Sequence, residues 1–381
     1  MLTDVTIEGL RGVGKVELKF APDQRVYTLF GENGIGKTKC LEALYQYLLA
    51  SNKGFWNFAK PTRGLNSEIL VMDRMTGAPH PVSLKRIEEK QDIGKVWEAE
   101  DSAPWHDSPV VFLGAGQRAN FGNVSAVSAL GKFAERRQKY FGALLSVLRQ
   151  HDLRSLGMAG DTRAWFVARA RSDNPYEKSR DNRKAEIDAV LSMLHDIDSR
   201  IDPTGFQIDA DDHVFLIIKT DEYELGELSS GFAALVKTMQ AIIEGYAAFT
   251  NEVQLRNVRG IVLIDEIDAH LHAEWQVRII PCLKKLLPNT TFFVTTHSPL
   301  VLVRLLQKEA YLLKRDDDGV VRSQKIAYPN RRLFSDVLDD VLGVNLNKLK
   351  RVSMEDDDQK EAKQGLLALL DQLEAQERVE P

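Results

Sequence analysis

Residues 31–38, "GENGIGKT", have a composition and spacing suited to binding a phosphate group. Two glycines bracket the loop, and a lysine and a threonine follow the second one, which is the P-loop pattern. Glycine lets backbone N–H groups turn toward a phosphate, and the helix that begins here adds a partial positive charge. Lys37 would reach the β- and γ-phosphate oxygens, and the Thr38 hydroxyl would bind Mg²⁺. The predicted nucleotide-binding residues of this loop are Gly31, Asn33, Gly34, Gly36, Lys37 and Thr38.

A second chemical feature is the acid pair Asp265 and Glu266, which follows the apolar run 261–264. A continuous apolar run of this kind predicts a buried parallel strand. At its end Asp265 would hold Mg²⁺ through water, and Glu266 would orient or deprotonate the attacking water. Adjacent acids can also be no more than a solvated strand end. Together with the P-loop, they predict the second half of an ATP site, with ATP and Mg²⁺ as the cofactors.

Two shorter motifs complete the pattern: "LSSGF", residues 228–232, and "TTHSP", which contains His297. Taken alone, Ser-Ser-Gly predicts a helix N-cap, and a histidine at a strand end is usually structural. Their order along the chain carries more information. A P-loop is followed by a Ser/Gly-rich helix start, a strand that ends in Asp-Glu, and a strand that ends near His. This order is far more specific than any single motif.

In this order the motifs resemble those of ABC-type ATPases. They are similar to the soluble group of these ATPases that includes the SMC, RecF and OLD (overcoming lysogenisation defect) proteins and the AAA_15 and AAA_21 families. Leu228, Ser229 and Gly231 match the ABC signature LSGGQ, whereas Ser230 and Phe232 depart from the transporter form. The segments "IDAHLH" and "TTHSPLVL" are similar to OLD and related ATPases rather than to transporter subunits. The chain also resembles the ATPase subunits of anti-phage defence systems.

The resemblance implies a homodimer that sandwiches two ATP molecules, with room for a higher oligomer. Each ATP would be bound by the P-loop of one chain and by Ser229 and Gly231 of the other. A serine hydroxyl and free N–H groups at a helix start suit a γ-phosphate. His297 would contact that phosphate, and Asp268 would lie across the dimer interface.

Two further residues are assigned from the resemblance. Gln117, in the loop after the strand that ends near Leu113, is the candidate Q-loop glutamine, with a catalytic and metal-binding role. A polar residue in a loop after a strand is also common without such a role. Arg11 lies in the opening segment "IEGLRGVGKVELKF", which resembles the first strands of the group, and it would lie near the nucleotide.

The predicted fold is α/β, an ABC-ATPase (P-loop NTPase) core with an antiparallel β subdomain and a helical insertion. Residues 1–330 would form the ATPase domain, interrupted at about 125–205 by the insertion, and 331–381 would form a helical tail. Short alternating strands precede the P-loop. Residues 68–113 contain the strand-like runs "EILVMD", "PVSLKRI", "KVWEAE" and "PVVFLGAG", which predict an antiparallel sheet layered against the nucleotide core.

The helical insertion is the basic part of the chain. Between residues 131 and 190 there are 13 Lys/Arg and 8 Asp/Glu, while the whole chain has a net charge of −5. These cations could contact DNA phosphates or an acidic partner, or they could be an ordinary solvated helix surface. The residues concerned are Arg136, Arg137, Lys139, Arg169, Arg171, Arg183 and Lys184.

The part of the sequence after His297 shows no catalytic motif. OLD proteins carry a Toprim nuclease after the ATPase, and the residues that follow His297 are too few for that domain. An HNH-like His/Cys cluster is also missing, so we predict that the chain has no nuclease of its own. A leucine stripe in the tail could pack on the chain's own core or dock a partner helix. Its members are Leu366, Leu369, Leu370 and Leu373.

The bulk composition limits the setting. Two cysteines without metal-ligand spacing favour a reducing compartment. No apolar run approaches the roughly 20 residues that cross a bilayer, so we expect a cytoplasmic protein without a membrane partner.

The motifs and the resemblance together predict a slow ATPase that dimerises around ATP and controls a separate effector, expected to be a nuclease, in anti-phage defence. One alternative is a RecF-like DNA-repair clamp in which the ATP dimer itself grips DNA. Another is a scaffold whose ATP state controls assembly with little turnover. Transporter energisation fits least well.

Overall fold

The computed structural model describes most of the chain before residue 332. The described residues are 2–59, 69–78, 83–85, 106–118, 121, 127, 129–174, 176, 178 and 181–331. The chain divides into two compact units, 1–331 and 332–381, and the second lies outside the described residues. The predicted helical tail and its leucine stripe therefore stay predictions. Of the helices described, none is long and apolar enough to span a bilayer.

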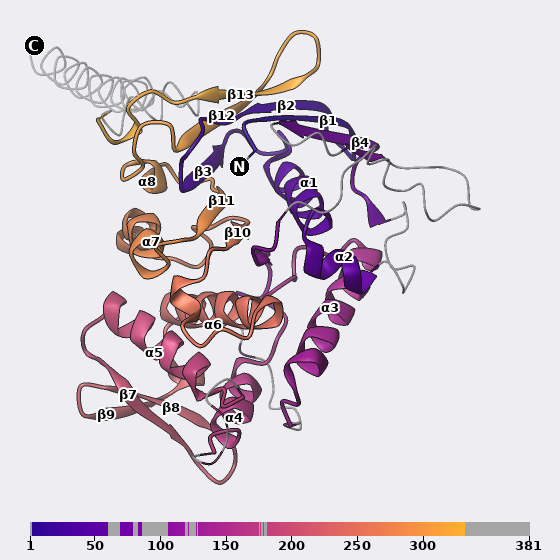
Figure 1. Cartoon of the computed structure of the whole chain (residues 1–381). Coiled ribbons are helices and arrows are strands. Elements are labelled where there is room, and N and C mark those ends of the chain that lie inside the picture. The colour runs from indigo at the N-terminus through magenta and orange to yellow at the C-terminus, as the bar shows by residue number, and fades with distance from the viewer. Residues whose placement is uncertain are drawn as a thin grey trace, which may run out of the picture. The chain divides into compact units, whose positions relative to one another are not determined.

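A mixed sheet forms the centre of the first unit (Figure 1). Its strand order is β5-β4-β1-β2-β13-β12-β3-β11-β10-β6. The strands are β1 (Asp4–Leu10), β2 (Gly14–Lys19), β3 (Val26–Phe30), β4 (Arg74–Ala78), β5 (Ser83–Lys85), β6 (Val110–Leu113), β10 (Ile261–Ile264), β11 (Thr291–Thr295), β12 (Ala310–Arg315) and β13 (Val321–Lys325).

The strands β12, β3, β11, β10 and β6 run parallel to one another. Every residue of β3, β6 and β10 is buried, as their continuous apolar sequences predict. Successive side chains point to opposite faces. Leu263 packs in the core with Leu44 of α1 (Lys37–Ala50), and Ile264 lies near Leu235 of α6 (Ser230–Phe249). Helices therefore cover both faces of the sheet. The P-loop, the acid pair and His297 follow the carboxyl ends of the neighbouring strands β3, β10 and β11, so they lie along the same side of the sheet.

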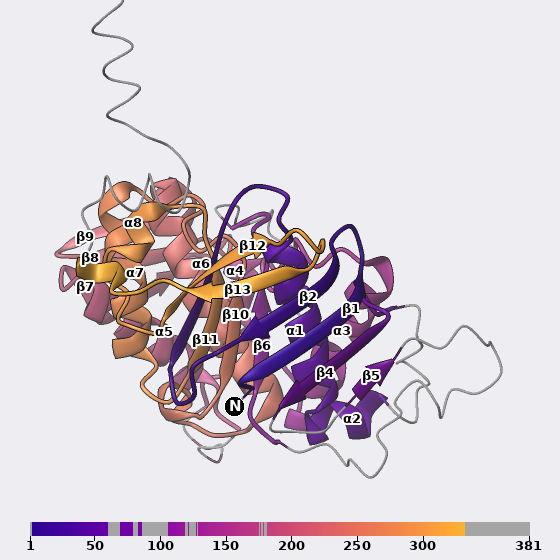
Figure 2. The same cartoon turned by 90° about the horizontal axis from the view of Figure 1, so that it is seen from above.

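The predicted α/β P-loop fold is confirmed, but the antiparallel strands do not form a layer of their own. The strand β1 pairs with β2 on one side and with β4 on the other, and β2 pairs with β13, so these strands extend the central sheet (Figure 2). The segment 69–73, predicted as a strand, is irregular with bends at 71–73, and the strand β4 begins at Arg74; the run 95–100 lies outside the described residues. The strands β12 and β13 form an antiparallel hairpin that turns near residue 316.

Within its described residues, the helical insertion contains three helices: α3 (Phe133–Gln150), α4 (Thr162–Arg171) and α5 (Lys184–Ile197). After them comes a small antiparallel sheet of β7 (Ile201–Ile208), β8 (Val214–Ile218) and β9 (Asp221–Glu224). In α3 the apolar positions spaced i, i+3, i+4 and i+7 are buried, as the periodicity predicts: Phe141, Leu144, Leu145 and Leu148. The other helices are α2 (Lys53–Ala59), α7 (Ala273–Leu286), α8 (Pro299–Leu302) and short 3₁₀ turns at Leu225–Glu227, Leu255–Asn257 and Pro329–Arg331.

Two of the predicted basic surface residues are buried, which corrects the expectation of one continuous basic face. Arg183 is 1% exposed and Arg169 is 7% exposed. Both donate to the Glu186 carboxylate, at 2.5 and 2.8 Å. A buried arginine needs such a partner because desolvation of an unpaired charge is costly. Arg171 and Lys184 do lie at the surface.

Candidate nucleotide-binding site

The P-loop joins β3 to α1 and depends on glycine at positions that other residues rarely occupy. Gly31, Gly34 and Gly36 have φ angles of 150°, 80° and 104°. A Cβ on Gly36 would lie 2.6 Å from Cγ2 of Val13, closer than real contacts allow. The same glycine precedes the first residue of α1. The loop therefore brings its backbone close to the start of α1, where N–H groups can bind a phosphate.

The Lys37 side chain lies inside this loop. Its Nζ donates hydrogen bonds to the carbonyl oxygens of Gly31 and Glu32, each at 2.8 Å, and the residue is 5% exposed. Burial removes water from the ammonium group and lowers its pKa from 10.5 to about 8, although Asp265 and Glu266 act in the opposite direction. The loop thus holds a buried ammonium group on two neutral carbonyl oxygens, and charged phosphate oxygens accept stronger hydrogen bonds from such a donor, which fits a site for a nucleoside triphosphate.

We expect nucleotide affinity to fall as the pH rises above about 8. Phosphate contacts favour the charged form of Lys37, so its pKa rises on binding and the protein takes up a proton between the free and bound values. The affinity should then decrease by up to about tenfold per pH unit in this range. Calorimetric titration with Mg·ATP near pH 7 and pH 9, in two buffers of different ionisation enthalpy, measures both effects. Equal affinities at the two pH values, or a pH dependence that persists in Lys37→Met, would contradict the assignment.

Asp265 connects the P-loop to the neighbouring strands. Its carboxylate accepts hydrogen bonds from Thr38 Oγ1, at 2.9 and 3.1 Å, and from Thr295 Oγ1, at 2.6 Å. Asp265 is 1% exposed and its backbone N–H is bound to the Leu113 carbonyl. Hydroxyl and carboxylate oxygens are the ligands that Mg²⁺ prefers. Thr38 and Asp265 therefore fit the predicted metal site, either directly or through water.

Glu266 is half-buried next to Asp265, in a backbone conformation with φ of 47°. A non-glycine residue in this left-handed region is uncommon and is held by its surroundings. Its N–H donates to Thr295 Oγ1 at 2.7 Å, and its carbonyl accepts from Arg118 Nη1 at 2.6 Å. Both the N–H and the carbonyl of Glu266, the predicted base, are therefore held by side chains of the fold.

The sequence interpretation did not identify Thr295 or Arg118. Thr295 is a polar residue at the end of the apolar run "TFFVT", which was an available signal. Arg118 is 2% exposed, and burial lowers its pKa to about 10. Its only signal was a single cation in the short loop after β6.

Asp268 and His297 lie together at the same sheet edge. The Asp268 carboxylate accepts from Thr296 Oγ1 at 2.5 Å and from the His297 backbone N–H at 3.3 Å. His297 is half-buried and follows β11 by two residues. The structure therefore places the predicted γ-phosphate contact beside the residue predicted to cross the dimer interface.

Gln117 and Arg11 lie near the site but make other contacts. Gln117 is exposed with φ of 58°, and its carbonyl accepts from Lys237 Nζ at 3.2 Å. Arg11 lies in the turn between β1 and β2, whose Val13 approaches Gly36, and its guanidinium is 3.3 Å from His151 Nε2. Their roles toward nucleotide stay predictions.

The signature motif begins α6. Ser229 is the N-cap residue, and its Oγ accepts from the Phe232 N–H at 3.4 Å. A Cβ on the buried Gly231 would meet the His270 carbonyl at 3.2 Å and the His272 ring at 3.4 Å. The exposed helix start is therefore next to the segment that follows Asp268.

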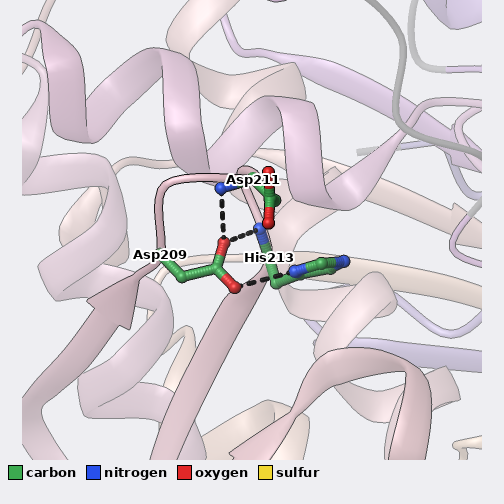
Figure 3. Close-up of side chains that lie close together, drawn as sticks. All are labelled: Asp209, Asp211 and His213. Atoms are coloured by element: carbon green, nitrogen blue, oxygen red, sulfur yellow. Dashed lines mark hydrogen bonds and ion pairs between the residues drawn. The ribbon is translucent and has the colours of Figure 1, made fainter.

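A separate group of potential metal ligands lies in the turn between β7 and β8 (Figure 3). The Asp209 carboxylate accepts from the backbone N–H groups of Asp211 and His213, at 2.9 and 2.8 Å, and contacts His213 Nδ1 at 2.8 Å. In this exposed turn the Asp209 carboxylate is already bound by groups of the turn itself. Its contact with His213 raises the pKa of that histidine. We assign no metal to it.

The fold and the first site together define an α/β P-loop nucleotide-binding core. Its strand-loop-helix holds a buried lysine and lies next to a strand that is followed by a hydroxyl-bound aspartate and a glutamate.

Comparison with known proteins agrees with this class. Residues 172–303 match the family described as "AAA domain, putative AbiEii toxin, Type IV TA system". The chain is 24% identical over 367 residues to "Septu protein PtuA" of Bacillus thuringiensis, covering 91% of this chain and 85% of that protein. It is 52% identical over 64 residues to "Retron Ec83 probable ATPase" of Escherichia coli, a local match that covers 17% of this chain and 12% of that protein.

Among solved structures, an SMC head bound to the C-winged helix domain of ScpA aligns with a TM-score of 0.45 and 14% identity, over 87% of this chain and 99% of that chain. This score is too low to add to the fold assignment. The sequence relatives confirm the predicted resemblance.

Proposed function

We propose that this protein binds and hydrolyses ATP with Mg²⁺, dimerises around the nucleotide and controls a separate effector in anti-phage defence. The observation that carries the proposal is the contact of Thr38 and Thr295 with the Asp265 carboxylate, beside the fixed backbone of Glu266. This arrangement joins the phosphate-binding loop to an acid that can act on water. We further propose slow turnover, a cytoplasmic location and no nuclease activity in this chain.

The proposed roles follow from position. Lys37 and the N–H groups of the P-loop bind the β- and γ-phosphates, while Thr38 and Asp265 hold the Mg²⁺ site. Bound Mg²⁺ would neutralise charge on the phosphate oxygens. Glu266 accepts a proton from the attacking water, and His297 contacts the γ-phosphate.

A second chain supplies the rest of the proposed site. Ser229 and Gly231 present a helix start whose exposed end contacts the segment after Asp268. A helix N-terminus favours an anion, so the signature of one chain would bind the γ-phosphate on the P-loop of the other. Each site would then be complete only in the ATP-bound homodimer.

The defence role is supported by the relatives, whose names place them in Septu and retron systems. We propose that the effector is a nuclease encoded separately. The DNA-clamp alternative is weakened because Arg169 and Arg183 are buried against Glu186 and cannot meet a DNA backbone.

Co-expression with the products of the adjacent genes tests the effector role. We expect a stable complex whose nuclease activity depends on ATP and is lost in Lys37→Met. Binding of labelled duplex DNA by the purified chain alone is the opposing measurement. The clamp would instead be favoured if DNA affinity falls at least tenfold between about 50 and 200 mM salt. It would also require that the double variant Arg171→Glu, Lys184→Glu no longer binds DNA. Nuclease activity that is indifferent to Lys37→Met would contradict control by ATP.

A further inference from the structure

The loop of residues 114–118, which follows β6, joins the catalytic acids to two other parts of the fold. Arg118 donates from Nη2 to the carbonyls of Gly114, at 2.9 Å, and Asp265, at 2.5 Å. Its Nη1 donates to the carbonyl of Glu266 at 2.6 Å. The guanidinium is thus bound to the two successive peptide groups that precede and follow the Glu266 Cα.

Two successive carbonyls can contact one guanidinium only if the chain turns. In an extended strand, neighbouring carbonyl groups point in opposite directions. The left-handed conformation of Glu266, with φ of 47°, brings both carbonyls toward Arg118. The planar guanidinium has donors in a fixed fork that suits two acceptors at once. Arg118 therefore favours the turned conformation of Glu266 over an extended one.

The loop that carries Arg118 is itself anchored at several points. The N–H groups of Gly114 and Gly116 donate to the carbonyls of Leu156 and Arg154, in the segment between α3 and α4. A Cβ on Gly114 would lie 2.1 Å from the Arg154 carbonyl oxygen, so this approach requires glycine. Lys237 of α6 donates to the Gln117 carbonyl. Arg118 consequently projects from a base that α6 and the helical insertion both hold.

We propose that Arg118 is a positioning residue for ATP hydrolysis, which fixes the Glu266 backbone so that its carboxylate meets the attacking water. The inference rests on the proposed function, with Glu266 as the base. Arg118 acts through backbone carbonyls and is not proposed to touch the nucleotide. Its loss therefore affects the catalytic step and leaves phosphate binding by Lys37 in place.

The test compares Arg118→Lys and Arg118→Met with a matched control, Arg25→Lys. Arg25 also donates its guanidinium to three backbone carbonyls, those of Thr290, Lys284 and Leu287, but away from the acid pair. We expect both Arg118 variants to lower kcat, by about 10²-fold in Arg118→Met, because small displacements of a catalytic group have effects of this size. Affinity for a fluorescent ATP analogue with Mg²⁺ should change by less than about threefold. Arg118→Lys should retain more activity, and Arg25→Lys should keep the wild-type kcat.

A second comparison uses Glu266→Gln, alone and combined with Arg118→Lys. If Arg118 acts through Glu266, adding Arg118→Lys to Glu266→Gln should lower the residual turnover little further. An independent, full-sized further loss would overturn the proposal, as would an unchanged kcat in Arg118→Lys or an equal loss in Arg25→Lys. Loss of nucleotide binding by folded Arg118→Lys would overturn it as well. Wild-type turnover in Glu266→Gln would instead overturn the proposed function, whatever Arg118 does.

Discussion

Glu266→Gln is expected to lower ATP turnover by about 10²- to 10⁴-fold, the usual contribution of a general base. Glutamine keeps the shape of the side chain but cannot accept the proton from water. The contacts that Glu266 makes with Thr295 and Arg118 come from its main chain, so the substitution leaves them intact. Nucleotide binding should persist, and the protein should accumulate as an ATP-bound dimer. Single-turnover hydrolysis and light scattering after gel filtration measure the two effects.

Two variants sharpen this result. Glu252→Gln makes the same chemical change at an exposed position just after α6, and it should hydrolyse ATP at the wild-type rate. Ser229→Arg, added to Glu266→Gln, should prevent the ATP-dependent dimer because the bulky cation blocks the proposed contact at the start of α6. Normal turnover in Glu266→Gln would remove it as the base. A dimer that forms equally well with Ser229→Arg would remove the signature from the interface.

Lys37→Met is expected to weaken nucleotide binding by about 10²- to 10³-fold. The ammonium group is the buried cation of the P-loop, and charge-assisted hydrogen bonds each contribute about 1.5–3 kcal/mol. Methionine has a similar length but offers neither charge nor donor. The wild-type melting temperature should rise with Mg·ATP, and this rise should disappear in the variant. A titration with a fluorescent nucleotide gives the change in Kd.

The control for Lys37→Met is Lys53→Met, which removes an exposed lysine that pairs with Asp107. Exposed pairs contribute little, so this variant should bind nucleotide and melt like the wild type. If Lys37→Met keeps the wild-type Kd, the loop does not bind the phosphates through this residue. If both variants lose affinity equally, the effect is one of net charge rather than of the site.

The positions of the P-loop, Asp265 and His297 could be predicted because each follows an apolar run that only a buried strand explains. Neighbouring parallel strands bring such strand ends to one edge, and β3, β11 and β10 are neighbours in the sheet. The helix α3 could likewise be predicted from the spacing of its apolar residues. Local pattern and the geometry of parallel sheets therefore carried most of the core fold.

The contacts of Arg118 could not be predicted in this way. They join a side chain to backbone carbonyls 147 and 148 residues away, and carbonyl groups leave no trace in a sequence. The prediction that Arg169 and Arg183 lie at the surface was wrong for a related reason. A count of charges treats each arginine as exposed, whereas packing of the helices brings both against Glu186. Tertiary packing, which buries these side chains, rather than local preference, decided these positions.

The order of strands in the central sheet has a consequence for how the protein is made. The strand β3, which leads into the P-loop, lies between β11 and β12, and β2 lies between β1 and β13. During synthesis β3 therefore has neither neighbour until much of the chain has left the ribosome. Such long-range pairing makes folding slow and leaves strand edges exposed to aggregation in the meantime. The ATP pocket consequently forms only after β11 and β12 have been synthesised, so nucleotide binding reports a chain that extends at least that far.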